Sequence, residues 1–423
     1  MKFLRLAFIL LGTMAAAQVR ERLTLQQAEE IALRNHPLIN AARFTAMAAA
    51  QVPAQHASSR YPTVTGSFTG AAAPENTRLA AGAINNPVIY SRLSSGVTVT
   101  QTLHDFGRTS HLVASARMQS QAKDQLTRSV RSQVLLDVAR AYFSALRADA
   151  VMHVAQETVA SRQLSADQVN ALAEARLKSG LDVTFANVAL EEGNLLLITA
   201  ENERRAARAN LAAALGYTNA PEFELVDEPL KIEPLSKDEL IATALRERPD
   251  LQALALEAEA AARFAKAEKA LNYPTISAVA SAGLIPEGAS ALRSNYAAGG
   301  VTVSLPFLNG GMFKARQEEA LLKARAAEER RKDLERQIVR DVTVALLNVN
   351  TAEERVHLTA RLLEQARQAL DLAQSRYELG LSSIVELSQA QLAVTSAAIQ
   401  QANAKYEYRI QRAILDFHTG VRH

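Results

Sequence analysis

The chain has 423 residues, of which 48% are apolar and 22% charged, enough for two or three ordinary domains or one very elongated one. Its formal net charge is +3, and it falls to about +1 if Lys2 and Arg5 are removed with the N-terminal leader described below. A chain with nearly equal numbers of basic and acidic residues gives no support for nucleic-acid binding. The absence of cysteine excludes disulfides, thiolate metal sites, cysteine nucleophiles and an acylated N-terminal cysteine.

Residues 1–17 are expected to be a secretory signal peptide. Two cations precede an apolar run from Leu6 to Met14, and three alanines form a small-residue cleavage site before Gln18. This run is too short to span a bilayer, and no later stretch approaches the roughly 18 apolar residues of a transmembrane helix. A buried N-terminal helix is the alternative. An exported chain without such a helix is expected to be either soluble outside the cytoplasm or a β-barrel.

The whole chain is predicted to be a tandem repeat, and the predicted fold class depends on recognising this repeat. The copies match in order along the chain, while the displacement between them falls from 212 through 204 to 200 residues. Duplication followed by loop trimming leaves such a collinear series. The matches pair Thr24–Gln27 with Ser236–Glu239, Tyr61–Thr63 with Tyr273–Thr275, Gly96–Val99 with Gly300–Val303, and Gly180 with Gly380.

Both members of the first match are predicted to be capping boxes that open similar helices, which run up to Pro37 and Pro249. Repeat 1 is expected over residues 18–218 and repeat 2 over 236–423. Between them, residues 219–235 contain three prolines, which forbid a continuous helix. This connector is expected to be an irregular link with room for one strand.

Each repeat contains a predicted pair of strands, at about 61–71 and 95–106 in repeat 1 and about 273–284 and 299–308 in repeat 2. Val97 and Val99 alternate with Thr98 and Thr100, which gives an apolar face and a hydroxyl-rich face. Strands of about ten residues with this pattern are typical of tilted strands that cross an outer membrane. A half-buried sheet in a soluble domain is the alternative.

One chain offers four such strands, whereas the smallest closed membrane barrels need about eight. If the strands span a membrane, several chains must therefore build the barrel. Five aromatic residues near the strand ends are candidates for an interfacial girdle: Tyr61, Tyr90, Phe106, Tyr273 and Tyr296.

Very long helices follow the strands, at about 108–179 and 182–215 in repeat 1 and about 312–379 and 382–418 in repeat 2. Gly180 and Gly380 fit left-handed C-caps before a tight turn, so each repeat is expected to end in a helical hairpin. The turn lies at an Arg-xxx-Gly-Leu sequence in both copies. A heptad seam with small residues is predicted at Val356, Thr359, Leu363, Ala366, Leu370, Ala373 and Tyr377.

The repeats, together with "HDFGR" at 104–108 and "FLNGGMFKAR" at 307–316 where strand becomes helix, resemble the outer-membrane efflux protein family, the TolC-like channels. The resemblance covers essentially the whole mature chain. It implies a mainly α fold with membrane β structure, assembled as a homotrimer. A 12-stranded β-barrel in the bacterial outer membrane, in contact with its lipid, would be continuous with an α-barrel that extends into the periplasm.

The resemblance also implies partners, namely a periplasmic adaptor (membrane fusion protein) and an inner-membrane transporter. Gly180 and Leu181 in the first hairpin, and Gly380 and Leu381 in the second, match the residues at which the family's hairpin tips contact the adaptor. A plain C-cap turn is the alternative for these residues.

A periplasmic gate is the last feature that the resemblance implies. Glu386 supplies the first acid of the family's gating segment, and Tyr377 matches an aromatic residue of its network. Gln389 stands where the second acid would be, and Ser382 replaces a basic residue of some members. With Ala186 opposite Glu386 in the first copy, an acidic gate is expected to depend on the second hairpin alone. A solvated helix face is the alternative for Glu386.

No enzyme, metal site or cofactor is expected, because the chain has no P-loop, GxSxG or HExxH sequence and no pair of histidines at metal-ligand spacing. Asp105-Phe106-Gly107 lacks the companion motifs of a kinase. The expected function is a passive exit duct, either of a tripartite efflux pump that exports small toxic compounds or of type I secretion. The alternative is an exported periplasmic coiled-coil scaffold or adaptor without a pore, which would have no use for two strand pairs.

Overall fold

The computed structural model describes residues 21–74, 91–218, 223–230, 232, 234–287 and 293–421. The predicted signal peptide and Tyr90 lie outside the described residues. The chain forms two compact units. The hairpin unit contains residues 21–36, Val134–Pro234 and Asn348–Ala413; the sheet unit contains Pro37–Gln133, Leu235–Leu347 and the chain from Ile414.

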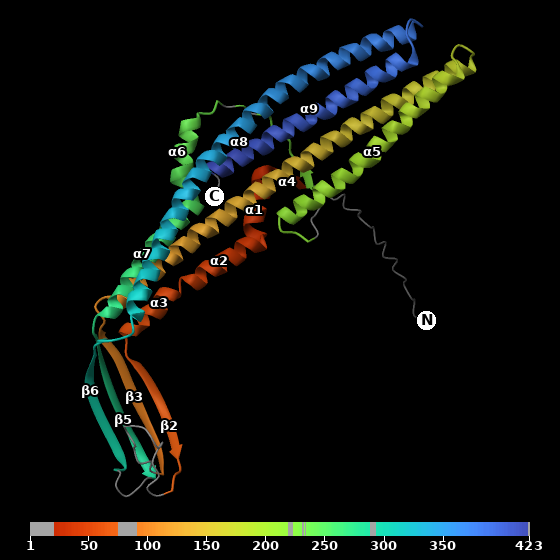
Figure 1. Cartoon of the computed structure of the whole chain (residues 1–423). Coiled ribbons are helices and arrows are strands. Elements are labelled where there is room, and N and C mark those ends of the chain that lie inside the picture. The colour runs from red at the N-terminus through yellow and green to blue at the C-terminus, as the bar shows by residue number, and fades with distance from the viewer. Residues whose placement is uncertain are drawn as a thin grey trace, which may run out of the picture. The chain divides into compact units, whose positions relative to one another are not determined.

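The sheet unit holds a four-stranded antiparallel sheet to which each repeat contributes two adjacent strands (Figure 1). The order is β2 (Thr63–Ala71), β3 (Arg92–His104), β5 (Thr275–Glu287) and β6 (Asn295–Ser304). Among the described residues, β2 and β6 each pair with a strand on one side only. The sheet therefore has two open edges.

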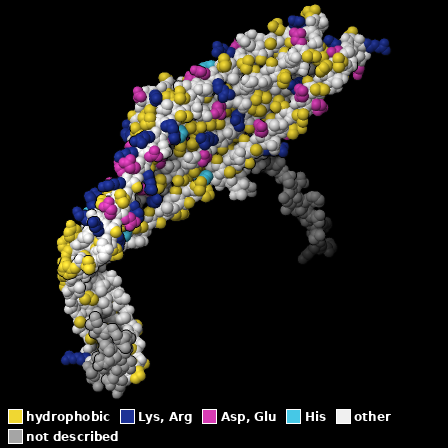
Figure 2. Space-filling view, viewed as in Figure 1, with side chains coloured by type: hydrophobic (Ala, Val, Ile, Leu, Met, Phe, Trp, Pro, Cys, Tyr) yellow, Lys and Arg dark blue, Asp and Glu magenta, His cyan; other side chains and the backbone are white. Residues whose placement is uncertain are grey.

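The strand register confirms the two predicted faces. Val97 pairs with Gly66 and Ala282, and Val99 pairs with Val64 and Ala280, which places apolar and small side chains together. Thr98 pairs with Thr65 and Ser281 on the opposite face, where its hydroxyl lies 3.0 Å from that of Ser281. The strand surface visible in Figure 2 is almost free of charge, in contrast to the helices.

The two strands that lead into the long helices end earlier than predicted, whereas β2 ends at the predicted residue and β5 three residues later. The strand expected over 95–106 runs from Arg92 to His104, because the Asp105 carboxylate accepts hydrogen bonds from the backbone N–H groups of Gly107 and Thr109 and starts the next helix. The strand expected over 299–308 runs from Asn295 to Ser304, two residues before Pro306, which has no N–H for a ladder bond.

Both repeats turn from strand to helix through two consecutive left-handed residues. In repeat 2 these are Gly310 and Gly311, with φ of 61° and 83°. In repeat 1 they are Phe106 and Gly107, with φ of 52° and 88°. A left-handed residue other than glycine costs about 1–2 kcal/mol. Phe106 offsets part of this cost because its ring stacks on Tyr273 at a centroid distance of 5.7 Å.

Two helices of the sheet unit, one in each repeat, begin at a proline. α2 (Pro37–Ala49) is followed by α3 (Val52–Ala57), and α6 (Lys237–Glu247) by α7 (Pro249–Lys269). Pro37 and Pro249 do end the preceding helices, as predicted, but each also starts a further one, because proline fits the first helical position. Short 3₁₀ turns, Ser58–Arg60 and Ala270–Asn272, lead into the strands.

One of the two predicted capping boxes forms. Thr24 caps α1 (Leu25–Asn35): its hydroxyl accepts from Gln27 N at 3.2 Å, and Gln27 Oε1 accepts from Thr24 N at 2.9 Å. The prediction for Ser236 is wrong, because its side chain makes no capping hydrogen bond to α6.

The long helices form two antiparallel pairs, whose tips lie in the hairpin unit (Figure 1). α4 (Arg108–Glu174) pairs with α5 (Gly180–Ala214), and α8 (Met312–Glu378) with α9 (Ile384–Thr419). α4 and α8 have the same length, 67 residues, and α4 ends five residues before the predicted position. All residues of the predicted heptad seam are buried or half-buried. No described helix is long and apolar enough to cross a membrane.

The connector contributes a strand to the hairpin unit. β4 (Phe223–Leu225) pairs in parallel with β1 (Glu21–Leu23). The buried hydroxyl of Tyr142, on α4, lies 2.7 Å from Leu23 O and 2.8 Å from Val226 O and links the two segments. Burial raises the pKa of Tyr142 to about 12, so the hydroxyl remains a donor to these carbonyls well into the alkaline range.

Candidate functional site

The tips of the two hairpins are the candidate site, and both close in the same way. α4 ends with Arg176 in the left-handed conformation (φ 62°), and Leu177 N donates to Leu172 O at 2.8 Å. α8 ends with Gly380 at φ 73°, and Leu381 N donates to Arg376 O at 2.8 Å. These are Schellman turns. Arg176 therefore corresponds to Gly380, and Leu177 to Leu381.

The predicted displacement of 200 residues at the tips is wrong, because the Schellman turns are 204 residues apart. Gly380 is the predicted left-handed C-cap, but Gly180 is the first residue of α5 and is not left-handed. The Arg-xxx-Gly-Leu match in the first hairpin is a coincidence of sequence. The useful signal was the 204-residue displacement between Gly96 and Gly300, which continues unchanged to Gly216 and Gly420, both left-handed.

The corrected register gives the first hairpin an acidic residue opposite Glu386. Ser179 caps α5, and Asp182 at the third helical position accepts hydrogen bonds from Ser179 N at 3.0 Å and Ser179 Oγ at 2.8 Å. These bonds lower the pKa of Asp182. Glu386 occupies the same position in α9, where its N–H donates to Ser383 Oγ at 3.3 Å. The expectation that Ala186 lies opposite Glu386 is therefore wrong.

Tyr377 lies inside the packed core of the tips. Residues from both hairpins form this core: Ala166, Val169, Ala186, Tyr377, Ile384 and Leu387. Lys178 Nζ lies 4.0 Å from the centroid of the Tyr377 ring. Burial, with the charge of Asp182, raises the pKa of Tyr377. Its buried hydroxyl makes no hydrogen bond within the described residues. Tyr377 thus joins the two tips by packing and by a cation–π contact.

The other predicted gate residues lie on the surface. Glu386 is half-exposed, and its Oε1 lies 3.6 Å from Arg376 Nε. Gln389, one turn further along α9, is exposed. The structure brings Tyr377 together with Lys178 and Asp182, whereas Glu386 pairs within its own hairpin. Lys178, Asp182 and Arg376 are members of this network that the sequence analysis missed.

Large apolar side chains are exposed at both tips. Leu177 is 70% exposed, Leu381 67% and Leu181 66%. Leu379, beside Gly380, is also exposed. Single exposed leucines are common on protein surfaces. Four within two adjacent turns make an apolar patch that suits contact with a partner.

A buried arginine links the helices of the first hairpin. Arg162, on α4, is 4% exposed, and its guanidinium donates to Ala189 O at 2.5 Å and reaches Glu192 at 3.4 Å. Gly193 leaves room for it, because an added Cβ there would lie 3.3 Å from Arg162 Cδ. Nearby, the hydroxyls of Thr158 and Thr395 lie 3.1 Å apart. No group of three or more acidic or histidine residues in the described chain could hold a metal ion.

Comparison with known proteins gives a consistent result. The model of the outer membrane efflux protein family matches residues 29–217 and 240–421. Outer membrane protein TolC of Salmonella enteritidis is 24% identical over 357 residues, which cover 79% of this chain and 70% of that protein. The solvent efflux pump outer membrane protein SrpC of Pseudomonas putida is 26% identical over 345 residues, 78% and 71% of the two chains. In fold, the Campylobacter jejuni CmeC outer membrane channel superposes with a TM-score of 0.81 over 94% of this chain and 85% of its own, at 16% identity.

The corrected register predicts opposite results for two matched glycine substitutions. Gly380→Ala should speed hydrogen exchange at the second tip about tenfold, because alanine in the left-handed conformation costs about 1–2 kcal/mol. Gly180→Ala should leave exchange at the first tip unchanged or slower, because Gly180 is helical and nothing lies within 4 Å of an added Cβ. Hydrogen-exchange mass spectrometry of peptides from both tips measures this. Equal acceleration at both tips would restore the 200-residue register.

Proposed function

Because the chain belongs to the outer membrane efflux protein family, we propose that it is the passive exit duct of an efflux pump. It is an outer-membrane protein and not an enzyme, since its homologues are TolC and the outer-membrane components of efflux pumps. The family match across both repeats is the observation that carries the proposal. SrpC belongs to a solvent efflux pump, which favours small toxic compounds over secreted proteins as the cargo of this chain.

Three copies are proposed to form one duct. The sheet has an apolar face for lipid, a hydroxyl-rich face for water, and open edges at β2 and β6. If β6 of one copy pairs with β2 of the next, three chains give twelve strands in a closed wall without edges, as spanning a bilayer requires. The long helices would continue this wall into the periplasm. A scaffold or adaptor without a pore would leave these strand edges unused.

The hairpin tips are proposed to bind the periplasmic adaptor that links the duct to an inner-membrane transporter. Gly380 and Leu381 lie in the Schellman turn of the second tip, and Gly180 and Leu181 begin α5 beside the first. The corrected register adds Leu177, which stands where Leu381 stands. Burial of these exposed leucines against an apolar groove of the adaptor supplies the binding free energy.

Leu381→Asp should abolish export while the protein still assembles in the outer membrane, because a carboxylate cannot be buried in an apolar contact. Leu177→Asp should have the same effect, since it occupies the equivalent turn. Cellular accumulation of a fluorescent efflux substrate measures export, and Leu381→Met is the control that keeps the apolar contact. Normal export by Leu381→Asp, with normal protein level, removes the docking proposal.

An acidic constriction at the tips is also proposed, built by Glu386 together with Asp182. Three copies would place six carboxylates near the axis, and such a ring favours cations. Arg376 neutralises part of each Glu386 charge. Gln389 adds no charge, and Tyr377 holds the tips together through Lys178. Both hairpins therefore contribute to the gate, contrary to the expectation that the second acts alone.

Reversal potentials in planar bilayers test this constriction. Glu386→Gln and Asp182→Asn should each reduce the preference for cations, and the double variant should reduce it further, because each substitution removes three carboxylates from the trimer. Glu354→Gln, an exposed acid on α8 well before the tip, is the control and should change nothing. An unchanged preference in the double variant rules out the constriction.

A further inference from the structure

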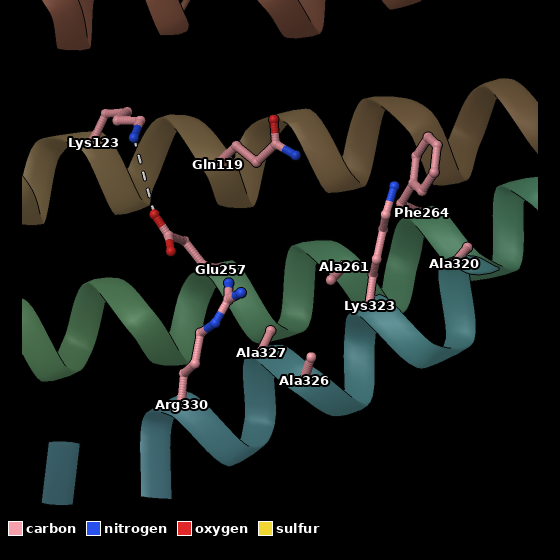
Figure 3. A pocket seen from close by; sticks show the side chains of 10 residues that line it. All are labelled: Gln119, Lys123, Glu257, Ala261, Phe264, Ala320, Lys323, Ala326, Ala327 and Arg330. Atoms are coloured by element: carbon pink, nitrogen blue, oxygen red, sulfur yellow. Dashed lines mark ion pairs between the residues drawn. The ribbon is translucent and has the colours of Figure 1, made fainter. Parts of the chain in front are cut away.

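A groove of about 540 Å³ lies in the sheet unit, between α4, α7 and α8 (Figure 3). Both repeats contribute to it, since α4 belongs to the first and the other two helices to the second. All of its walls are helices of one chain, so that no second copy is needed to build it. Its volume is within the range of small-molecule sites, about 300–1,000 Å³.

The floor of the groove is apolar. It consists of four alanines, Ala261 on α7 and Ala320, Ala326 and Ala327 on α8. Phe264 adds an aromatic wall and is 38% exposed. In Figure 3 its ring rises from α7 beside Lys323, toward α4. A flat apolar molecule placed on the alanines would contact this ring and cover surface that is now exposed to water.

The rim of the groove is cationic. Lys123, Lys323 and Arg330 line it, with Glu257 as the only carboxylate in the lining. Lys123 forms an ion pair with Glu257, which the dashed line in Figure 3 marks. The distance from Lys123 Nζ to Glu257 Oε1 is 4.0 Å, which is too long for a hydrogen bond. Arg330 makes no ion pair within the described residues. Lys323 Nζ donates to Glu319 Oε1 at 2.5 Å on the same helix, with both side chains exposed, so an anion would compete with Glu319 for Lys323, whereas Arg330 is free to meet it.

The spacing of the cations suits a ligand with both an apolar and an anionic part. Lys323 and Arg330 are seven residues apart on α8, so they lie on one face about 10 Å apart. Ala326 and Ala327 lie between them. A ring system on these alanines would hold an acidic substituent within reach of one cation or the other.

From this complementarity of charge and shape, we propose that the groove binds small amphipathic anions: an aromatic ring system that carries one carboxylate or sulfonate. A second groove, of about 670 Å³ between α7 and α8, suits such a ligand less well. It has walls from two helices only, no aromatic residue, and two carboxylates, Glu259 and Glu328, in its lining. The proposal concerns binding alone and does not depend on the export function.

The test is titration calorimetry of naphthalene-2-sulfonate against the full-length protein in phosphatidylcholine nanodiscs, with empty nanodiscs as the blank. The wild type should bind the sulfonate, and the neutral naphthalene-2-carboxamide should bind much more weakly. Lys323→Gln with Arg330→Gln should weaken sulfonate binding about tenfold, because neither cation of α8 is then left to make the charge-assisted contact. Ala327→Leu should abolish binding by filling the floor.

Two further variants keep the result independent of folding. Glu257→Gln should tighten binding, because it removes the only carboxylate of the groove and frees Lys123, and a gain cannot come from misfolding. Lys266→Gln, in the lining of the second groove, is the matched control and should leave the affinity unchanged. Absence of binding above the blank, equal binding of the neutral analogue, or loss of binding in Lys266→Gln alone would overturn the proposal.

Discussion

The two open edges of the sheet are the constraint on which the rest of the structure depends. β2 and β6 each pair on one side only within the described chain, although the sheet already has an apolar face suited to lipid. Unpaired backbone groups cost several kcal/mol each in a bilayer, so a spanning sheet must close. Four strands are too few to close alone. The proposed threefold assembly follows from this constraint.

The duplication explains how one chain serves such an assembly, and where its copies have diverged. Repeat 2 uses glycine at the left-handed positions at both ends of its long helix, Gly310 and Gly380. Repeat 1 places Phe106 and Arg176 there. Each of these residues costs about 1–2 kcal/mol in that conformation. Stacking on Tyr273 offsets part of the cost at Phe106, and no comparable contact of Arg176 is seen among the described residues. The first hairpin tip is therefore the more strained.

The periodic features of the fold were predictable from the sequence. The alternation of apolar and polar residues at Val97 and Thr98 predicted the two faces of the sheet correctly. The heptad spacing predicted the buried face of α8. Both patterns repeat over many residues, so a single exception does not change the prediction. Single-residue features were less predictable. Thr24 forms its capping box and Ser236 does not, although both have the same sequence pattern.

The candidate site was predicted only in part, because a short motif was given more weight than the register of the long helices. Glycine is preferred at a left-handed C-cap but is not required there. Because the first turn has Arg176 at this position, it was not recognised in the sequence, and the predicted register did not place Asp182 opposite Glu386. Arg162 was missed for a different reason. Its burial depends on Gly193 of the neighbouring helix, and arginine is usually exposed.

Cell fractionation followed by native mass spectrometry of the extracted protein tests the central claim most directly. The account predicts that the protein is found in the outer membrane, requires detergent for extraction, and has the mass of three chains. A soluble periplasmic protein, or a single chain extracted from the membrane, would contradict it, because one chain leaves the edges of β2 and β6 unpaired.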